Sequence, residues 1–244
     1  MEDIIHNLNY IHSRMIAACH KAGRKPEEVR LLMATKTVPP ERIIMALSAG
    51  EHLIGENKIQ EIKEKYEALR DTQHETHFIG HLQTNKIKDI IKCDVDCVQS
   101  VDRMDLALKL NERLKAAGRK LDVLIQVNTS EEESKFGVHP DKAIDLVREV
   151  SRLENLKIKG LMTIGLFSEN PEEARPCFQL LHNIRKQIIV LNIEGVEMAE
   201  LSMGMSGDLE TAIEEGATII RVGTAIFGKR IYPDSYYWNE NKNQ

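Results

Sequence analysis

The sequence predicts one α/β domain, a (β/α)8 TIM barrel with an extra helix at its N-terminus. First, short apolar runs alternate with helical patterns through eight units. Second, these runs lack the polar–apolar alternation of half-exposed strands, which is typical of strands buried on both faces of a parallel sheet. Third, the 244 residues contain no linker rich in Gly, Ser or Pro, and roughly 250 residues suffice for one barrel.

The elements follow one another with short connections. A helix is expected first, at residues 3–22, and Gly23 stands where a C-terminal cap would lie. The expected strands are the apolar runs at residues 30–34, 52–55, 77–81, 97–101, 121–127, 158–164, 196–201 and 219–222. The helical patterns between them lie at residues 41–49, 59–69, 86–91, 103–118, 140–153, 171–190 and 208–215. Asp102 is predicted to be the N-cap of the helix that follows it. The domain is expected to span residues 1–244, with a polar tail at 233–244.

Composition excludes several classes of protein. Lys and Arg number 33 and Asp and Glu 38, and this net charge of −5 argues against a dedicated nucleic-acid binder. No stretch approaches the roughly 20 apolar residues of a membrane span. The first ten residues carry acids where a signal peptide would need bases. The four cysteines lack metal-binding spacing and are predicted to be free thiols of a reducing compartment. We therefore predict a cytoplasmic protein.

Polar residues follow the expected strands at the end where such barrels carry their active sites. They are Lys36, Asn57, His81, Asn128, Ser202, Ser206, Arg221, Gly223 and Thr224. The loops after the last two strands combine hydroxyls, glycines and a helix start, and such loops often bind phosphate. The sequence therefore predicts a phosphate site there, although Ser, Gly and Asp are also ordinary helix caps.

Lys36 ends the first apolar run. Its side chain is expected to point into the barrel mouth, where loss of water lowers the pKa of the amine and makes it nucleophilic. A lone lysine more often reaches solvent. Beside a phosphate site, however, a nucleophilic amine suits a ligand that carries both an aldehyde and a phosphate. Pyridoxal 5'-phosphate (PLP) carries both.

Five motifs occur in order along the chain. They are ATKT at residues 34–37, GENK at 55–58, HFIGHLQTNK at 77–86, LSMGMS at 201–206 and RVGTAIFG at 221–228. With them the sequence resembles the YggS/PROSC family of pyridoxal phosphate homeostasis proteins, from about residue 5 to Tyr232. The fold that this resemblance implies is the barrel of the alanine racemase N-terminal domain.

The resemblance also implies roles for individual residues. Lys36 would hold PLP as a Schiff base, Arg221 would face the pyridine nitrogen, and Asn57 would line the ring. The phosphate would be held by Ser202, Ser206, Gly223 and Thr224, with the backbone of Met203 close by. The family is associated with vitamin B6 balance, so PLP, other B6 vitamers and PLP-dependent apoenzymes are the expected partners.

The expected role is that of a carrier without catalysis. Arginine keeps its proton and leaves the pyridine nitrogen unprotonated, which weakens the ring as an electron sink. Alanine racemases add a second base, a tyrosine from a further domain, and this chain is not expected to replace it with Tyr232, Tyr236 or Tyr237. Because racemase dimers rely on that domain, a monomer is expected. No metal ligand is predicted.

Three other interpretations stay open. The first is a PLP-dependent enzyme similar to an amino-acid racemase. The second is an aldolase that uses Lys36 on a sugar phosphate, with His81 as the acid or base, and the third is a pure interaction protein. His81 is predicted to be a ligand contact or a structural histidine. Lys135 resembles a lysine that recurs in the family, and a role in cofactor transfer is one hypothesis for it. Lys229 and Arg230 would be a basic pair near the mouth or surface charge. Glu131, Glu132 and Glu133 are expected to form a solvated loop rather than a metal site.

Overall fold

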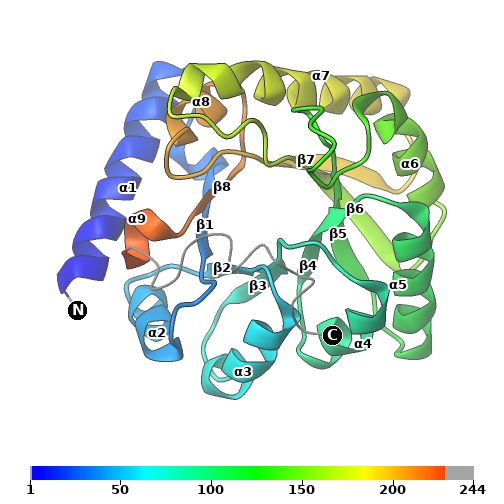
Figure 1. Cartoon of the computed structure of the whole chain (residues 1–244), viewed down its shortest axis with the longest axis horizontal. Helices are drawn as coiled ribbons and strands as arrows, with labels where there is room; N and C mark the ends of the chain where they lie inside the picture. Colours follow the sequence, from blue (N-terminus) through cyan, green and yellow to red (C-terminus); the bar gives the residue numbers. More distant parts are fainter. Residues whose placement is uncertain (1, 229–244) are drawn as a thin grey trace.

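The computed structural model describes residues 2–228, in which eight parallel strands close a barrel in sequential order (Figure 1). The strands are β1 (Arg30–Ala34), β2 (Leu53–Glu56), β3 (Glu75–Phe78), β4 (Cys97–Val101), β5 (Leu121–Gln126), β6 (Leu156–Met162), β7 (Val196–Ser202) and β8 (Ile219–Val222). The predicted barrel is therefore confirmed.

Helices surround the barrel on the outside. They are α1 (Glu2–Lys21), α2 (Pro40–Ser48), α3 (Ile59–Leu69), α4 (Ile87–Lys92), α5 (Met104–Ala116), α6 (Ala143–Val150), α7 (Arg175–Leu191), α8 (Leu209–Glu214) and α9 (Thr224–Phe227). Short 3-10 turns precede four elements, at Pro26–Glu28, Thr84–Lys86, Pro140–Lys142 and Pro171–Ala174.

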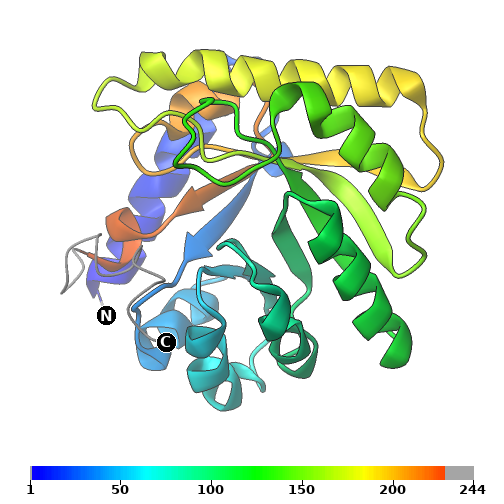
Figure 2. The same ribbon diagram turned by 45° about the vertical axis from the view of Figure 1, so that its right-hand side comes forward.

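The N-terminal helix covers the wall where the last strand meets the first. α1 packs against α2, α8 and α9, and both views show it on this side of the barrel (Figures 1 and 2). Its buried positions recur every three or four residues, at Ile4, Leu8, Ile11, Met15 and Cys19. Since α9 is a single turn, α1 provides the cover that a long final helix would give.

The apolar core has two parts. The larger lies between the sheet and the helices, and two smaller clusters consist of inward-facing strand residues. One of the smaller clusters contains Leu32, Leu53 and Ile219, and the other Cys97, Leu124 and Met162. All four cysteines of the sequence are described, buried and free of disulfides. Among residues 2–228, no helix has both the length and the apolar character needed to cross a membrane.

Several expected boundaries differ from the structure. β6, for example, spans Leu156–Met162 rather than residues 158–164. β3 ends at Phe78 rather than at residue 81. Beyond its end, Gly80 packs against the backbone of Asn57, where a Cβ atom would lie 2.0 Å from the carbonyl oxygen. The N-cap of α5 is Arg103 rather than Asp102. The Asp102 carboxylate instead accepts a hydrogen bond from Nη1 of Arg103 at 2.7 Å.

Candidate functional site

A chain of hydrogen bonds crosses the barrel interior below the carboxyl ends of the strands. Nη1 of Arg221 donates to the hydroxyl of Ser202 at 2.9 Å, and this hydroxyl donates to Oε1 of Gln99 at 2.6 Å. Gln99 is also 2.7 Å from Nδ1 of His77. These residues belong to β8, β7, β4 and β3, so the chain runs from one side of the barrel to the other. It forms a polar floor beneath the mouth.

Arg221 places a fixed positive charge in this floor. Its side chain is 6% exposed, and Nη2 donates to the carbonyl oxygen of Thr163 at 2.8 Å. Burial lowers the pKa of Arg221 to about 10, while the charge of Asp208 acts in the opposite direction. The guanidinium therefore stays protonated at neutral pH and remains a hydrogen-bond donor.

The loop after β7 is shaped by Asp208 and Gly204. Oδ1 of Asp208 accepts a hydrogen bond from the backbone N–H of Met205 at 2.5 Å. Gly204 has a φ of 89°, and a Cβ atom there would lie 2.4 Å from the Cβ of Ala212. Its carbonyl oxygen accepts the N–H of Arg221 at 3.0 Å, which ties this loop to β8.

The structure separates the predicted phosphate residues of this loop into two groups. Ser202 is fully buried and belongs to the polar floor. Met203 is also fully buried, and its N–H donates to the carbonyl oxygen of Ile219 at 3.2 Å. Ser206 is half-buried and stands in the loop itself. Ser206 is therefore the hydroxyl of this motif that lies nearer to solvent.

Gly223 brings the end of β8 against the end of β1. A Cβ atom at Gly223 would lie 2.9 Å from the carbonyl oxygen of Ala34 and 3.3 Å from its Cβ. Ala34 is the last residue of β1, and Lys36 follows two residues later in a half-buried position. Thr224 is exposed at the start of α9. The candidate amine and the candidate phosphate loops thus lie at the same end of neighbouring strands.

Asn57 and His81 occupy the next part of the rim. Asn57 is half-buried directly after β2, with its backbone against Gly80. The ring of His81 stacks on Phe136, with 3.8 Å between centroids and 18° between planes. Nδ1 of His81 is 3.9 Å from Oδ2 of Asp102. The stack joins the loop after β3 to the loop after β5.

Lys135 holds the acidic loop after β5 both within itself and to the loop after β6. Nζ of Lys135 contacts Oε1 of Glu132 at 2.7 Å and the carbonyl oxygen of Gly165 at 2.8 Å. Glu131 and Glu133 are exposed, as expected for a solvated loop. Throughout the described residues, no group of three or more His, Cys, Asp or Glu side chains is arranged to hold a metal ion. The predictions for Lys229, Arg230, Tyr232, Tyr236, Tyr237 and the tail fall outside the described residues.

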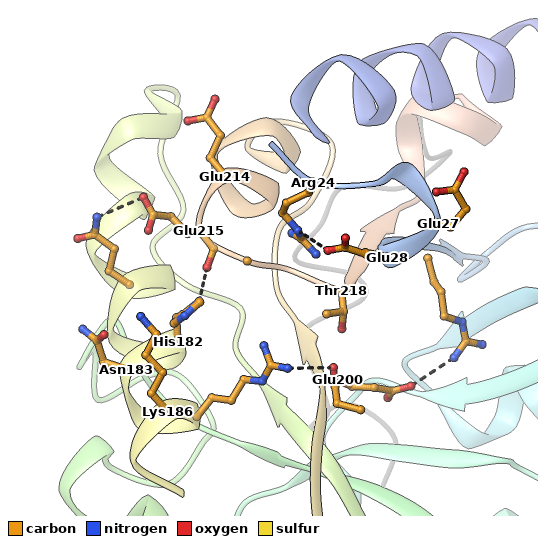
Figure 3. Close-up of a pocket in the computed structure, with 15 residues that line it drawn as sticks. Arg24, Glu27, Glu28, His182, Asn183, Lys186, Glu200, Glu214, Glu215 and Thr218 are labelled. Carbon is orange, nitrogen blue, oxygen red and sulfur yellow. Dashed lines mark hydrogen bonds and ion pairs between the residues drawn. The ribbon is translucent and has the colours of Figure 1, made fainter. Parts of the chain in front are cut away.

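The opposite end of the barrel carries a pocket of a different kind (Figure 3). Its charged side chains are largely paired with partners in the protein. Arg30 contacts Glu75 at 2.5 Å and Glu200 at 3.3 Å, and Nη1 of Arg24 donates to two backbone carbonyls at 2.8 and 2.9 Å. Such pairing ties β1, β3 and β7 together and points to stability rather than ligand binding at this end.

Sequence reasoning missed several residues of the mouth. Gln99 and Thr163 lie within or beside strands and belong to no motif, and the sequence singles out His77 only as the first residue of the motif at 77–86. Nothing in the sequence shows that their side chains meet Ser202 and Arg221 across the barrel. For Phe136, the signal available in the sequence was an aromatic residue within a polar loop.

Known proteins similar to this chain share its barrel fold. Residues 4–231 match the family described as alanine racemase, N-terminal domain. A pyridoxal phosphate homeostasis protein of Aquifex aeolicus is 45% identical over 92% of this chain and 97% of its own. The structure of PipY from Synechococcus elongatus with PLP bound has a TM-score of 0.80 and 30% identity, and the match covers 92% of this chain and 100% of PipY. An alanine racemase of Clostridium difficile shares the fold, with a TM-score of 0.75 at 14% identity, and is covered over 58% of its length.

Proposed function

Because the chain belongs to the pyridoxal phosphate homeostasis proteins, a family built on the alanine racemase N-terminal domain, we propose that it binds PLP on Lys36 and stores or supplies the cofactor. The observation that carries the proposal is the contact of Gly223 with Ala34. It joins the strand end that presents Lys36 to the strand end that presents Arg221 and Thr224.

The residues at the mouth fit the three functional groups of PLP. Lys36 offers an amine for the aldehyde, and Arg221 offers a protonated donor for the pyridine nitrogen. Ser206, Thr224 and the backbone at Gly223, where a side chain would not fit, suit the phosphate. Asn57 is proposed to line the ring. Since the hydroxyl of Ser202 is bonded to Arg221 and Gln99, we propose that Ser202 and the buried Met203 support the phosphate loop from beneath.

Attachment and release would be one reversible condensation. Nζ of Lys36 adds to the aldehyde carbon, a C=N bond forms, and the aldehyde oxygen leaves as water; addition of water reverses the step. When bound, PLP supplies an electrophilic imine and an electron sink. Arg221 holds its own proton, so it leaves the pyridine nitrogen unprotonated and keeps that sink weak. This supports a carrier without catalysis.

Location, assembly and partners complete the proposal. Four buried free thiols are typical of a reducing compartment, which supports a cytoplasmic location. Exposed large apolar side chains are spread over α1, α5, α7 and two loops, which supports a monomer. The proposed partners are PLP, other B6 vitamers and PLP-dependent apoenzymes.

Absorption spectroscopy with borohydride trapping tests the proposal. Purified protein with PLP should show a visible Schiff-base band, and after reduction the cofactor should be found on the peptide that contains Lys36. Lys36→Ala should lose both, whereas Lys186→Ala, at the opposite end of the barrel, should keep them. A Lys36→Ala protein that keeps the band would overturn the assignment. Exchange of the α-proton of alanine in D2O, dependent on Lys36, would support a racemase-like enzyme instead.

A further inference from the structure

Both chain neighbours of Lys36 are fastened to a buried ion cluster on the outer side of the sheet. The cluster consists of Glu56 at the end of β2 and of Glu61 and Lys65 on α3. Their side chains are 1%, 16% and 9% exposed, in that order. We call these three residues the Lys65 cluster.

Lys65 is the centre of the cluster. Its ammonium group lies 2.6 Å from Oε1 of Glu56 and 2.9 Å from Oε2 of Glu61. Its third contact is the backbone carbonyl oxygen of Thr35, at 2.9 Å. An ammonium group has three N–H donors, so the contact with Thr35 completes its set. Thr35, the residue before Lys36, therefore accepts one of the three hydrogen bonds of the Lys65 ammonium group.

The two acids hold the backbone on either side of Lys36. Oε1 of Glu56 accepts a hydrogen bond from the hydroxyl of Thr35 at 2.7 Å. Oε2 of Glu61 accepts one from the backbone N–H of Thr37 at 2.5 Å. Through Thr35 and Thr37, the cluster fixes where the main chain of Lys36 lies.

Thr37 shows that this position is imposed on the chain. Its φ is 64°, in the left-handed region, which a β-branched residue rarely adopts. Backbone strain of this kind persists only where surrounding contacts enforce it, and it gathers at functional sites. The hydrogen bond from Thr37 to Glu61 is such a contact.

The cluster is poorly suited to a purely stabilising role. Buried ion pairs lose solvation, and apolar side chains in their place are often as stable or more so. Oε2 of Glu56 is buried and has no hydrogen-bond partner among the described residues. Glu56 and Lys65 also line a cavity of about 230 Å³ between α3 and the sheet, so the region is loosely filled.

We infer that Glu56, Glu61 and Lys65 are positioning residues that hold Lys36 in place for its reaction with the aldehyde of PLP. The inference rests on the proposed function of Lys36. A nucleophile displaced by about 1 Å can lose on the order of 100-fold in rate, so a main chain released from the cluster should form the Schiff base slowly. The sites for the phosphate and the pyridine nitrogen belong to β7 and β8 and should be unaffected.

The test separates reaction at Lys36 from binding of the ligand. The rate of Schiff-base formation is measured by stopped-flow absorption with PLP. Affinity without a covalent bond is measured with pyridoxine 5'-phosphate, which has an alcohol in place of the aldehyde. Lys65→Met should slow Schiff-base formation at least tenfold while the Kd for pyridoxine 5'-phosphate changes less than about twofold, and Lys65→Arg should recover part of the rate.

The controls distinguish a failed inference from two other outcomes, which are loss of folding and failure of the proposed function of Lys36. Arg175→Met removes another cation held by three carboxylates, those of Glu172, Glu214 and Glu215, and should leave both measurements unchanged. If Lys65→Met does not fold, Glu61→Gln, at the rim of the cluster, is measured in the same way. A variant with the wild-type rate, or with equal losses for both ligands, overturns the inference. A wild-type protein that forms no bond at Lys36 overturns the proposed function itself.

Discussion

Nη1 of Arg221 lies 2.9 Å from the hydroxyl oxygen of Ser202, and this contact gives two serines of one short motif different roles. Ser202 is enclosed between Arg221 and Gln99, whereas Ser206, four residues later, stands in the loop at the mouth. The inner serine is bonded to a buried charge, and the outer one is half-buried in the loop, where we propose that it contacts the phosphate.

The two serines should respond differently to removal of the hydroxyl. Ser202→Ala leaves Nη1 of Arg221 and Oε1 of Gln99 without their partner, so the free energy of unfolding should fall by about 1–3 kcal/mol. Ser206→Ala should change it by less than about 0.5 kcal/mol but weaken PLP binding about tenfold. Urea unfolding and PLP titration of both variants provide the measurement. Equal effects of the two substitutions would argue against this division.

A methyl group at Gly223 should separate β8 from β1. Because the Cβ atom would lie 2.9 Å from the carbonyl oxygen of Ala34, Gly223→Ala should lower the free energy of unfolding by about 1–3 kcal/mol. PLP affinity should fall as well, since the strand ends that carry Lys36 and Arg221 move apart. Gly207→Ala is the matched control, because no heavy atom lies within 4 Å of the added Cβ. A Gly223→Ala protein as stable as this control would contradict the prediction.

Stability should depend on pH through Glu56. Burial raises its pKa from 4.5 to about 7, against the lowering effect of Lys65. The folded protein therefore holds a proton that the unfolded chain has lost between these values. The free energy of unfolding should fall as pH rises from about 5 to 8, by up to the order of 3 kcal/mol.

Glu56→Gln isolates this contribution. The variant should lack the pH dependence that Glu56 provides. The difference in the free energy of unfolding between the wild-type protein and the variant should therefore change across pH 5–8. The groups around Glu56 remain the same in both proteins. They are Thr35 directly after β1, Glu61, Lys65 and Arg70 on or next to α3, and His74, Asp94 and Asp96 on the connections that line the cavity. If the free energy of unfolding changes with pH in the same way in both proteins, Glu56 does not titrate in this range.

The ring stack at the mouth should slow release of the cofactor. His81 and Phe136 join the loops after β3 and β5, and an aromatic pair of this kind contributes about 0.5–1.5 kcal/mol. Phe136→Ala should raise the rate of PLP release several-fold and, because Phe136 is 47% exposed, lower the free energy of unfolding by no more than the contribution of this pair. Release is followed by loss of the visible band after dilution into an aldehyde trap. Phe167→Ala, with a ring 80% exposed on the loop after β6, should release PLP at the wild-type rate.

Most of the barrel could be predicted because its strands are buried on both faces. The apolar runs at Arg30–Ala34, Cys97–Val101 and Ile219–Val222 coincide with their expected ranges. The expected range of β3 was shifted toward the C-terminus for two reasons. The first residues of the strand, Glu75 and Thr76, are polar, and the apolar run continues past Phe78, where the strand ends. Local pattern thus located elements well and their ends less well.

The site residues could be identified singly, but their relations could not. The motif that contains Ser202 and Ser206 shows two hydroxyls and no difference between them. The difference comes from Gln99, which is 103 positions from Ser202 in the sequence and 2.6 Å away in the barrel. Likewise, Glu56 and Lys65 belong to a strand and a helix whose packing decides that they meet beside Lys36.

The position of α1 has a consequence for the order of assembly during synthesis. α1 leaves the ribosome first, yet its partners α8 and α9, and the strand β8 that pairs with β1, are made last. Until then, of its partners α2, α8 and α9, only α2 can cover part of its apolar face, and Lys36 lacks Arg221 and Gly223 beside it. Contacts between distant parts of a chain form late in folding. If PLP binds at the proposed site, a growing chain should therefore take up the cofactor specifically only after β8 has been made.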